Sequence, residues 1–390
     1  MAISITQTPS QVSLAQSPTI FTLSESDSAL LTSSSFQYIA ELYYWTGSKA
    51  SVPSTSQYTL QKYPNPSGKG IFDVSRVLAS TLQDLVAENT SSAQYFKIDS
   101  YVQYKNNPTG SFVTGSHVTS SVYTAIDGYE IFQESVGQNI NTLTPHWPIL
   151  SDGPVTQSYL ADNEGEMSVF VGTSPASSPT RIKYTGNLGT AYFNLTTSSN
   201  TTETEIDTFP IGPQSTGFPL STSTSEFTIQ GYNVNTPLGT PITFELVCNK
   251  KYPNVRIKWK NRYGAFDYFN FNLVSRETFN TERSKFQPQI GSWGASSLSY
   301  QRYESSLQNY ITDSTIKLSV NTDYVPESYN DIFKQLMVSD EIYWVYDEAN
   351  DYVRPLSMDT STFSIKTHVV DKLIQYQFDF TQGQSYKLIF

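Results

Sequence analysis

The sequence predicts a mainly β protein made of tandem β-sandwich domains of the Ig-like kind, followed by a small C-terminal α+β unit. Three observations predict this. The 390 residues exceed the roughly 250–300 that one hydrophobic core organises, so we expect two or three domains. Tyr (27 residues) and Phe (22 residues) supply much of the apolar material, and aromatic side chains favour strands. Short apolar runs alternate with Pro, Gly and Ser, as in β-sandwiches.

The first predicted domain, residues 1–130, is a β-sandwich with one helix. Its expected strands are short alternating runs: Ile3–Ile5, Thr19–Leu23, Phe36–Trp45 and Tyr95–Tyr104. Asp73 is placed to cap a helix that ends near Asn89. The apolar residues of this helix recur on one face: Val74, Val77, Leu78, Leu82 and Leu85.

The second predicted domain, residues 155–273, is another β-sandwich. A connector rich in Pro and Gly, residues 144–154, predicts the boundary before it. Val255–Trp259 is expected to be its closing strand. Residues 196–225 are dominated by Ser, Thr, Pro and Gly, with too few apolar groups to offset the entropy of ordering them. We expect this tract to be a long surface loop that a neighbouring protein orders.

Residues 275–300 are expected to be irregular, and residues 300–390 to form the C-terminal α+β unit. Pro326 suits the first turn of its helix. The helix is expected to bury one apolar stripe: Tyr329, Ile332, Phe333, Leu336 and Met337. A meander of strands is expected after it, continuing to the last residue.

The final predicted strand is Tyr386–Phe390. Tyr386, Leu388 and Phe390 share one face, which we expect to anchor against the C-terminal helix. As the last strand it is expected to lie at a sheet edge, where free backbone groups can pair with another subunit. These three residues are therefore candidates for an interface.

The charge balance and the termini exclude several function classes. With 24 Lys+Arg against 35 Asp+Glu, the net charge of −11 argues against a nucleic-acid partner, because phosphate binding needs clustered cations. The single cysteine, Cys248, cannot form an internal disulfide, so we expect folding in a reducing cytoplasm. Met1–Gln7 has no secretory pattern, and no run approaches the ~20 apolar residues of a membrane span. We expect a soluble protein without membrane insertion.

No catalytic or metal-binding motif stands out. His117, His146 and His368 are far apart, and Cys248 has no Cys-x-x-Cys partner, so we expect no metal site. Carboxylates that could act as acid and base occur in three pairs: Glu164/Glu166, Asp340/Glu341 and Asp347/Glu348. In an acidic chain such pairs are typical of solvated turns. The nucleophile-elbow, Walker and dinucleotide motifs are absent, so we expect no cofactor and no enzyme.

One strand predicts a cationic surface. Alternation separates an apolar face from a basic one: Val255, Ile257 and Trp259 against Arg256, Lys258 and Lys260. We interpret the basic face either as an exposed strand protected from aggregation by its charge or as a contact to an acidic neighbouring subunit. Gly264 marks a hairpin turn after it. The aromatic residues beyond that turn are expected in the core, the alternative being a platform that stacks on glycans.

The same segment carries a family resemblance. Trp259, Asn261, Gly264, Asp267 and Phe271 have the spacing W-x-N-x-x-G-x-x-D-x-x-x-F. This spacing resembles a signature of tail and virion structural proteins of tailed phages, notably those infecting Bacteroidetes hosts. Further segments are similar to that family: Ser17–Phe21, Tyr63–Ser75, Leu336–Ser339, Ile342–Trp344 and Gln375–Phe380.

The resemblance implies a non-enzymatic virion protein, assembled in the host cytoplasm. It implies a homo-oligomeric tail, baseplate or neck component whose partners are copies of itself and other virion proteins, and it supplies no catalytic residues. The alternative is a β-sandwich protein that binds host-surface glycans for receptor recognition or on a cell surface. A glycan-cleaving enzyme using Glu164 or Glu166 ranks third.

Overall fold

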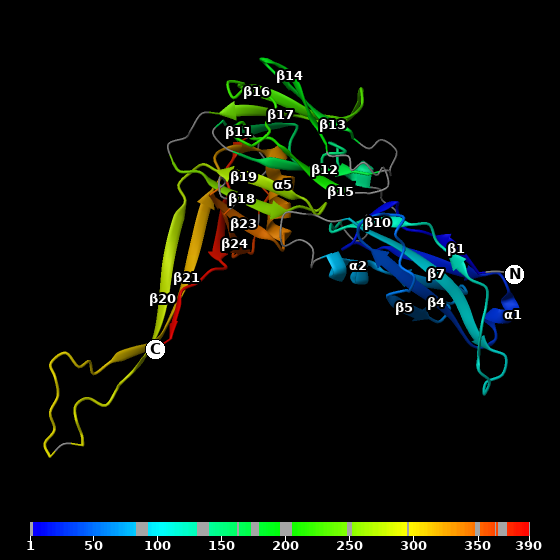
Figure 1. Cartoon of the computed structure of the whole chain (residues 1–390), viewed down its shortest axis with the longest axis horizontal. Coiled ribbons are helices and arrows are strands. Elements are labelled where there is room, and N and C mark those ends of the chain that lie inside the picture. The colour runs from blue at the N-terminus through cyan, green and yellow to red at the C-terminus, as the bar shows by residue number, and fades with distance from the viewer. Residues whose placement is uncertain are drawn as a thin grey trace. The chain divides into compact units, whose positions relative to one another are not determined.

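The computed structural model divides the chain into two compact units (Figure 1). Unit 1 comprises Met1–Asn249 and Lys260–Asp267, and unit 2 comprises Lys250–Trp259 and Tyr268–Phe390. The structure describes these residues: 3–82, 93–130, 140–161, 164–172, 179–195, 205–247, 252–294, 296–347, 352–362, 364–365 and 373–389. They are mainly β, as predicted. Of the helices in these ranges, none has the length and apolar character needed to cross a bilayer.

The N-terminal part of unit 1 contains two sheets around one core. The smaller sheet has the order β1 (Ile3–Gln7), β3 (Ile20–Glu25), β6 (Lys69–Asp73). The larger has the order β2 (Val12–Leu14), β10 (Tyr123–Ile126), β7 (Gln94–Lys105), β4 (Ser34–Trp45), β5 (Tyr58–Lys62), with β8 (Phe112–Thr114) and β9 (Val118–Thr119) also paired to β7. Alternation drives this packing, because Phe21 and Phe72 of one sheet meet Tyr38 and Phe96 of the other in a single cluster.

Two short helices accompany these sheets, α1 (Ser28–Leu31) and α2 (Ser75–Leu82). The expected cap of α2 is confirmed, since the backbone N–H of Ser75 donates to Asp73 Oδ1 at 3.0 Å. Leu78 and Leu82 are buried, as the apolar stripe predicts. The expected continuation to Asn89, including Leu85, lies outside the described residues.

The second part of unit 1 also places two sheets around one core. One has the order β11 (Thr156–Leu160), β17 (Thr236–Val247), β16 (Glu226–Asn233), β13 (Arg181–Gly186), β14 (Gly189–Asn194), and the other pairs β12 (Glu166–Val171) with β15 (Glu205–Pro210). The short helix α4 (Ile140–Leu143) precedes them. Val169 and Phe209 of the smaller sheet share a cluster with Tyr184, Phe227 and Phe244 of the larger one.

The expectation of a long loop at 196–225 is wrong for residues 205–210, whereas residues 211–225 form turns and irregular backbone, as expected. Glu205–Pro210 is a strand, and Phe209 and Ile211 are buried. Beyond it, the hydroxyl of Ser215 donates to the backbone oxygen of Gly165 at 3.0 Å. Few apolar residues are enough to order this segment, because Phe209 and Ile211 are two positions apart and fall on the inner face. Residues 196–204 lie outside the described ranges.

Unit 2 is built on an eight-stranded sheet. Its order is β19 (Phe266–Phe271), β18 (Val255–Lys260), β23 (Ile342–Asp347), β24 (Tyr352–Met358), β26 (Gln377–Gln382), β21 (Gln308–Asn321), β20 (Arg276–Phe286), with β27 (Lys387–Ile389) also paired to β21. Our expectation that Val255–Trp259 closes the second sandwich is therefore wrong. It pairs with β23, where Ile257 faces Trp344.

The predicted helix near Pro326 is confirmed. Two short strands, β22 (Val325–Pro326) and β25 (Leu373–Ile374), pair beside it, and η2 (Glu327–Tyr329) leads into α5 (Asn330–Val338). The predicted stripe faces the core of unit 2, since Phe333 lies 5.1 Å from Phe269 and 5.4 Å from Phe378 between ring centroids. Met337 is partly buried at the edge of this core.

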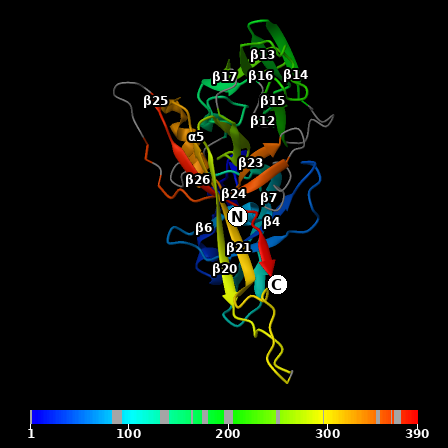
Figure 2. The same ribbon diagram turned by 90° about the vertical axis from the view of Figure 1, so that its left-hand side faces the viewer.

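Residues 275–300, expected to be irregular, begin instead with a strand of eleven residues. β20 and β21 form an antiparallel ribbon in which Arg276 faces Ser319 and Phe286 faces Gln308. Figure 2 shows the two strands side by side, with the connecting residues 287–307 at the far end of the ribbon. Ten of the eleven residues of β20 are exposed, so both faces of this strand meet solvent.

Candidate functional site

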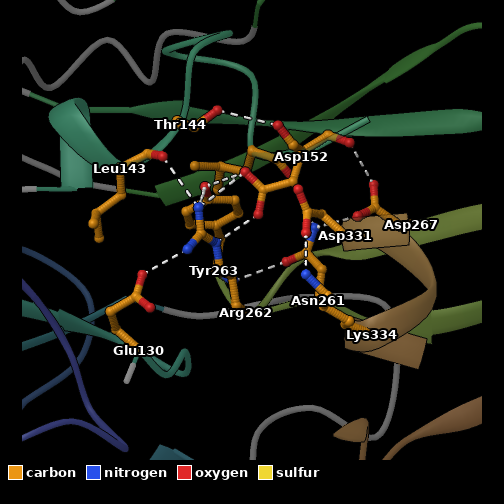
Figure 3. Close-up of polar contacts among 12 residues, drawn as sticks. Glu130, Leu143, Thr144, Asp152, Asn261, Arg262, Tyr263, Asp267, Asp331 and Lys334 are labelled. Atoms are coloured by element: carbon orange, nitrogen blue, oxygen red, sulfur yellow. Dashed lines mark hydrogen bonds and ion pairs between the residues drawn. The ribbon is translucent and has the colours of Figure 1, made fainter. Parts of the chain in front are cut away.

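A tight turn at Asn261–Ala265 forms the centre of a buried polar network in unit 1 (Figure 3). The backbone N–H of Asn261 donates to the oxygen of Ala265 at 2.7 Å, which closes the predicted hairpin. The Asn261 carboxamide oxygen also accepts from the N–H groups of Tyr263 and Ala265 at 3.0 and 3.1 Å. Gly264 has φ +73, and a Cβ there would lie 2.1 Å from the backbone oxygen of Asp127. Only glycine fits both the conformation and this approach.

Arg262 extends from the turn to two carboxylates. Its Nη1 donates to Glu130 Oε2 at 2.6 Å, and its Nε lies 2.5 Å from Asp152 Oδ2. Its Nη2 donates to the backbone oxygen of Leu143 at 3.1 Å. Burial lowers the pKa of Arg262, but Asp152, Tyr263 and Glu130 together outweigh it, so the pKa is raised overall and the guanidinium stays charged.

Tyr263 belongs to the same group of side chains. Its hydroxyl donates to Asp152 Oδ1 at 2.6 Å and accepts from Arg262 Nη2 at 2.8 Å. Burial raises the pKa of Tyr263, and the charge of Asp152 raises it further. The phenol therefore remains protonated and serves as a hydrogen-bond donor.

Lys260 forms a second ion pair, with Asp127. The ammonium donates to Asp127 Oδ2, and both side chains are almost fully buried, at 3% and 4% exposure. Gln16 Nε2 donates to the other oxygen of Asp127 at 2.9 Å. Burying both charges costs desolvation energy, which offsets much of their attraction. The pair therefore adds little to the free energy of unfolding and mainly holds the two side chains in one geometry.

Asp267 lies directly after the turn and is buried. Ser151 Oγ donates to its Oδ1 at 2.8 Å, and Asn261 Nδ2 donates to its Oδ2 at 3.0 Å. Burial raises the pKa of Asp267 to about 7; the two donors oppose this rise and the charge of Asp152 adds to it. Such a pKa suits a general acid or base. Because both oxygens already accept hydrogen bonds and the side chain is 6% exposed, the geometry favours a structural role.

The network connects the turn to both parts of unit 1. Asn261 Nδ2 donates to the backbone oxygen of Leu150 at 2.8 Å, and the N–H of Tyr129 donates to the backbone oxygen of Arg262 at 2.8 Å. A buried apolar cluster lies beside these contacts and is drawn from both parts of unit 1 and the turn: Val12, Leu14, Ala93, Ile126, Ile140, Leu150, Phe170, Tyr263 and Ala265. The turn therefore fixes the two parts of unit 1 to each other.

The histidines predicted to be poor metal ligands lie in separate places. His146 is buried, with its ring nitrogens 2.9 Å from the backbone oxygens of Thr240 and Gly153. His117 is exposed and pairs with Asp99 at 3.0 Å. His368 and Cys248 lie outside the described residues. Within the described ranges, no group of three His, Cys, Asp or Glu side chains is arranged to hold a metal ion.

The described members of the three carboxylate pairs lie at strand ends or close to them. Glu166 begins β12 and is exposed, and the backbone oxygen of Glu164 accepts from the Tyr159 hydroxyl at 2.5 Å. Asp340 and Glu341 stand between α5 and β23, and Tyr343 donates to Glu341 Oε2 at 3.3 Å. Glu348 lies outside the described residues, beyond Asp347 at the end of β23.

The predicted exposure of the basic strand is wrong. Arg256, Lys258 and Lys260 are 3%, 5% and 3% exposed. The Arg256 guanidinium lies 4.6 Å from the centre of the Tyr268 ring, and the Lys258 ammonium lies 5.6 Å from that of Tyr343. All six residues of β18 are buried, so both of its faces are covered, and a neighbouring strand pairs with each of its edges. These three cations are core residues and do not form a surface stripe.

The C-terminal strand differs from the prediction in its anchoring. β27 pairs with the outer half of β21, where Thr312 faces Leu388. Tyr386 is 66% exposed, and its ring lies 6.0 Å from that of Phe279 in the ribbon, so its expected burial against the helix is wrong. Phe390 lies outside the described residues.

The sequence reasoning missed the ribbon and its loop, where large apolar side chains gather in the open. Eight of them are between 41% and 84% exposed: Phe279, Phe286, Trp293, Leu298, Tyr300, Tyr303, Leu307 and Tyr310. Residues 276–286 contain no proline or glycine but show no apolar alternation, so the sequence carried only a weak signal for this strand. No family model matches the chain, and no curated protein matches it in sequence.

Proposed function

We propose that this chain is a non-enzymatic structural component of a tailed-phage particle, an oligomeric tail, baseplate or neck protein that packs against copies of itself and other virion proteins. The observation that carries the proposal is the β20–β21 ribbon. Ten of the eleven β20 residues are exposed, and the ribbon ends in a loop with exposed aromatic side chains. A two-stranded ribbon is marginal in water by itself, so a partner is expected to cover it.

The polar network supports a structural role over a catalytic one. Its charged groups form ion pairs with one another, as in Arg262–Asp152 and Lys260–Asp127. Catalysis needs a reactive group that a substrate can reach, and Asp267, whose pKa is about 7, is buried beneath its two donors. The virion assignment rests on the resemblance of Trp259–Phe271 to a virion-protein signature. The Asn, Gly and Asp positions of that signature also build this network.

We also assign the two sheet pairs of unit 1 to tandem β-sandwiches of the Ig-like kind. In each part, residues from two sheets share one hydrophobic core, as in sandwich domains. Repeated sandwiches offer several sheet edges and faces for lateral packing. Virion assemblies require such repeated contacts between symmetry-related copies.

The test is to locate the protein in particles. Purified virions should contain the chain in fixed stoichiometry, measured by quantitative mass spectrometry after density-gradient purification. A variant in which residues 287–307 are replaced by Asn-Gly joins Phe286 to Gln308 by a short hairpin turn. We expect this variant to fold with an unchanged Tm and to be lost from particles.

A matched control is Tyr63→Ala, which removes an aromatic side chain of 68% exposure from unit 1. This variant is expected to enter particles normally. The proposal is overturned if the wild-type chain is found only in the lysate and never in purified particles.

One observation favours glycan binding as a second candidate. The loop at the ribbon end forms an open hollow that combines aromatic with polar side chains, among them Trp293, Tyr300, Gln301 and Glu304. Concave sites with a few polar groups suit small ligands. On a glycan array, binding by the wild-type chain that Trp293→Ala abolishes would support this candidate.

A further inference from the structure

β20 presents an unused strand edge. It is the last strand in the order of the unit 2 sheet, with β21 on one side, and no further strand pairs with it in the described part of the chain. Its eleven residues, Arg276–Phe286, contain no proline or glycine. The register shift in the ribbon skips Tyr310, so the extra residue lies in β21 and β20 itself is continuous. A regular edge of this length can bind another strand.

The sequence of β20 is complementary to itself when reversed. If two copies run antiparallel about a two-fold axis at Thr281, residues equally distant from Thr281 face each other. Glu277 of one copy then faces Lys285 of the other, and Phe279 faces Arg283. At the ends, Arg276 faces Phe286. Opposite charges and cation–aromatic pairs placed directly across an antiparallel ladder are stabilising.

Competing registers are poorer. Moving the centre to Asn280 or Glu282 keeps the side chains on their faces but leaves only nine residues paired. The Asn280 centre pairs Glu277 with Arg283 but leaves Lys285 and Phe286 unpaired, and the Glu282 centre sets Glu282 against Glu282. Parallel pairing in register would place Arg283 against Arg283 and Lys285 against Lys285. Like charges directly opposite are destabilising. Paired length and charge together therefore favour the antiparallel register centred on Thr281, and the charges oppose open-ended parallel stacking.

We propose that β20 is a self-association strand, which pairs with β20 of a second copy of this chain in an antiparallel ladder centred on Thr281. The inference deepens the proposed function and rests on it, since it names the surface through which the chain packs against itself. The pairing joins two ribbons into a four-stranded layer. The contact is isologous, because each copy uses the same residues.

Cysteine cross-linking of the full chain tests the register. In a Cys248→Ser background, Thr281→Cys places two thiols at the symmetry centre. Residues directly opposite in an antiparallel pair have Cα atoms about 4.5–5.5 Å apart, within disulfide range. We expect most of the chain to run as a disulfide dimer on non-reducing gels after mild oxidation.

Thr278→Cys is the matched control, since Thr278 is on the same strand and faces Ser284 of the other copy. Two cysteines at 278 would be separated by six residues along the ladder, about 20 Å, so no dimer is expected. The double variant Thr278→Cys/Ser284→Cys restores a facing pair and should cross-link. Equal cross-linking by Thr281→Cys and Thr278→Cys, or none by Thr281→Cys, overturns the proposal.

A charge exchange tests the pairing without cysteines. Lys285→Glu sets two carboxylates opposite each other at two places in the dimer, and we expect the dimer dissociation constant from sedimentation equilibrium to rise about tenfold. Glu277→Lys/Lys285→Glu should restore it. Arg302→Glu, the same charge change in the loop outside β20, should leave it unchanged. Failure of the double variant to recover dimerisation counts against this register.

The two proposals can fail separately. If the chain is found in particles but Thr281→Cys does not cross-link, the β20 pairing is wrong and the virion assignment stands. If Thr281→Cys cross-links but the chain is never found in particles, the pairing stands and the virion assignment is wrong.

Discussion

β18 and β20 belong to one sheet and both carry basic side chains, yet their environments are opposite. β18 alternates basic with apolar side chains, as in Arg256-Ile257-Lys258, whereas β20 is mainly polar and holds two large apolar side chains, Phe279 and Phe286. All six residues of β18 are buried, whereas ten of the eleven residues of β20 are exposed. β18 lies between β19 and β23, and β20 is the last strand of the sheet. β18 therefore combines an inner position with an apolar face, whereas β20 combines an edge position with few apolar side chains.

The difference also changes what a cation does. On β18, Lys260 pairs with Asp127 and Arg256 stacks on Tyr268, so these cations make contacts inside the folded chain. On β20, Arg283 and Lys285 are exposed and can select a partner strand. The same residue types therefore stabilise the fold in one strand and, in the proposed self-association, select the partner in the other.

The largest predicted contrast compares two aromatic truncations. Trp259→Ala removes a fully buried side chain from the unit 2 core and should lower the free energy of unfolding by about 3–5 kcal/mol. Phe279→Ala truncates a side chain that is 57% exposed and should change it by less than about 0.5 kcal/mol. Denaturant unfolding followed by circular dichroism at low protein concentration measures both. Similar losses for the two variants would contradict the contrast.

The second prediction compares two lysines. Lys260→Ala leaves Asp127 as a buried charge with the Gln16 amide, so we expect a loss of about 3 kcal/mol. Lys285→Ala, on the exposed strand, should cost less than about 0.5 kcal/mol in the monomer. Lys260→Met/Asp127→Leu removes both charges and should recover most of the loss. If the double variant is less stable than Lys260→Ala, the pair is worth more than its desolvation cost.

The third and smallest effect depends on pH and concerns Asp267. The folded protein holds this proton up to about pH 7, whereas an unfolded Asp releases it near about pH 4. Because burial raises the folded-state pKa, the stabilising contribution is full below about pH 4 and is lost as the pH rises through about 7. The full shift corresponds to about 4 kcal/mol, and the altered hydrogen bonds of an amide offset part of it.

We therefore expect Asp267→Asn to be about 2 kcal/mol more stable than the wild type at pH 8 and to lose this advantage below pH 5. Thermal unfolding across this pH range measures the difference between the two proteins. Asp331→Asn, on an exposed residue of α5, is the control and should show no such trend. A difference that does not vary with pH would mean that Asp267 is ionised throughout.

Local features of the fold could be predicted from the sequence. The apolar stripe of α5 and the Asp73 cap of α2 depend on residues within a few positions of each other. The turn at Gly264 follows from a conformation that glycine favours. The mainly β character follows from composition, which does not depend on how the strands are connected.

What could not be predicted depends on long-range pairing. Lys260 is buried because Asp127, 133 residues earlier, meets it. Arg262 meets Glu130 and Asp152 across 132 and 110 residues. The sheet to which β18 belongs is decided by β23, where Ile257 faces Trp344. A strand pattern gives the two faces of a strand but not its neighbours, so the basic residues of β18 were wrongly placed at the surface.

The return of residues 260–267 to unit 1 has a consequence for the order of synthesis. Asp127 leaves the ribosome 133 residues before Lys260. At ~5–20 residues per second this delay is roughly 7–27 seconds, long enough for the first sheets to form. During that interval Asp127, Glu130 and Asp152 lack the two cations that later lie beside them. Unit 1 is therefore completed only after β18 of unit 2 has been translated, which ties the maturation of the first unit to production of the second.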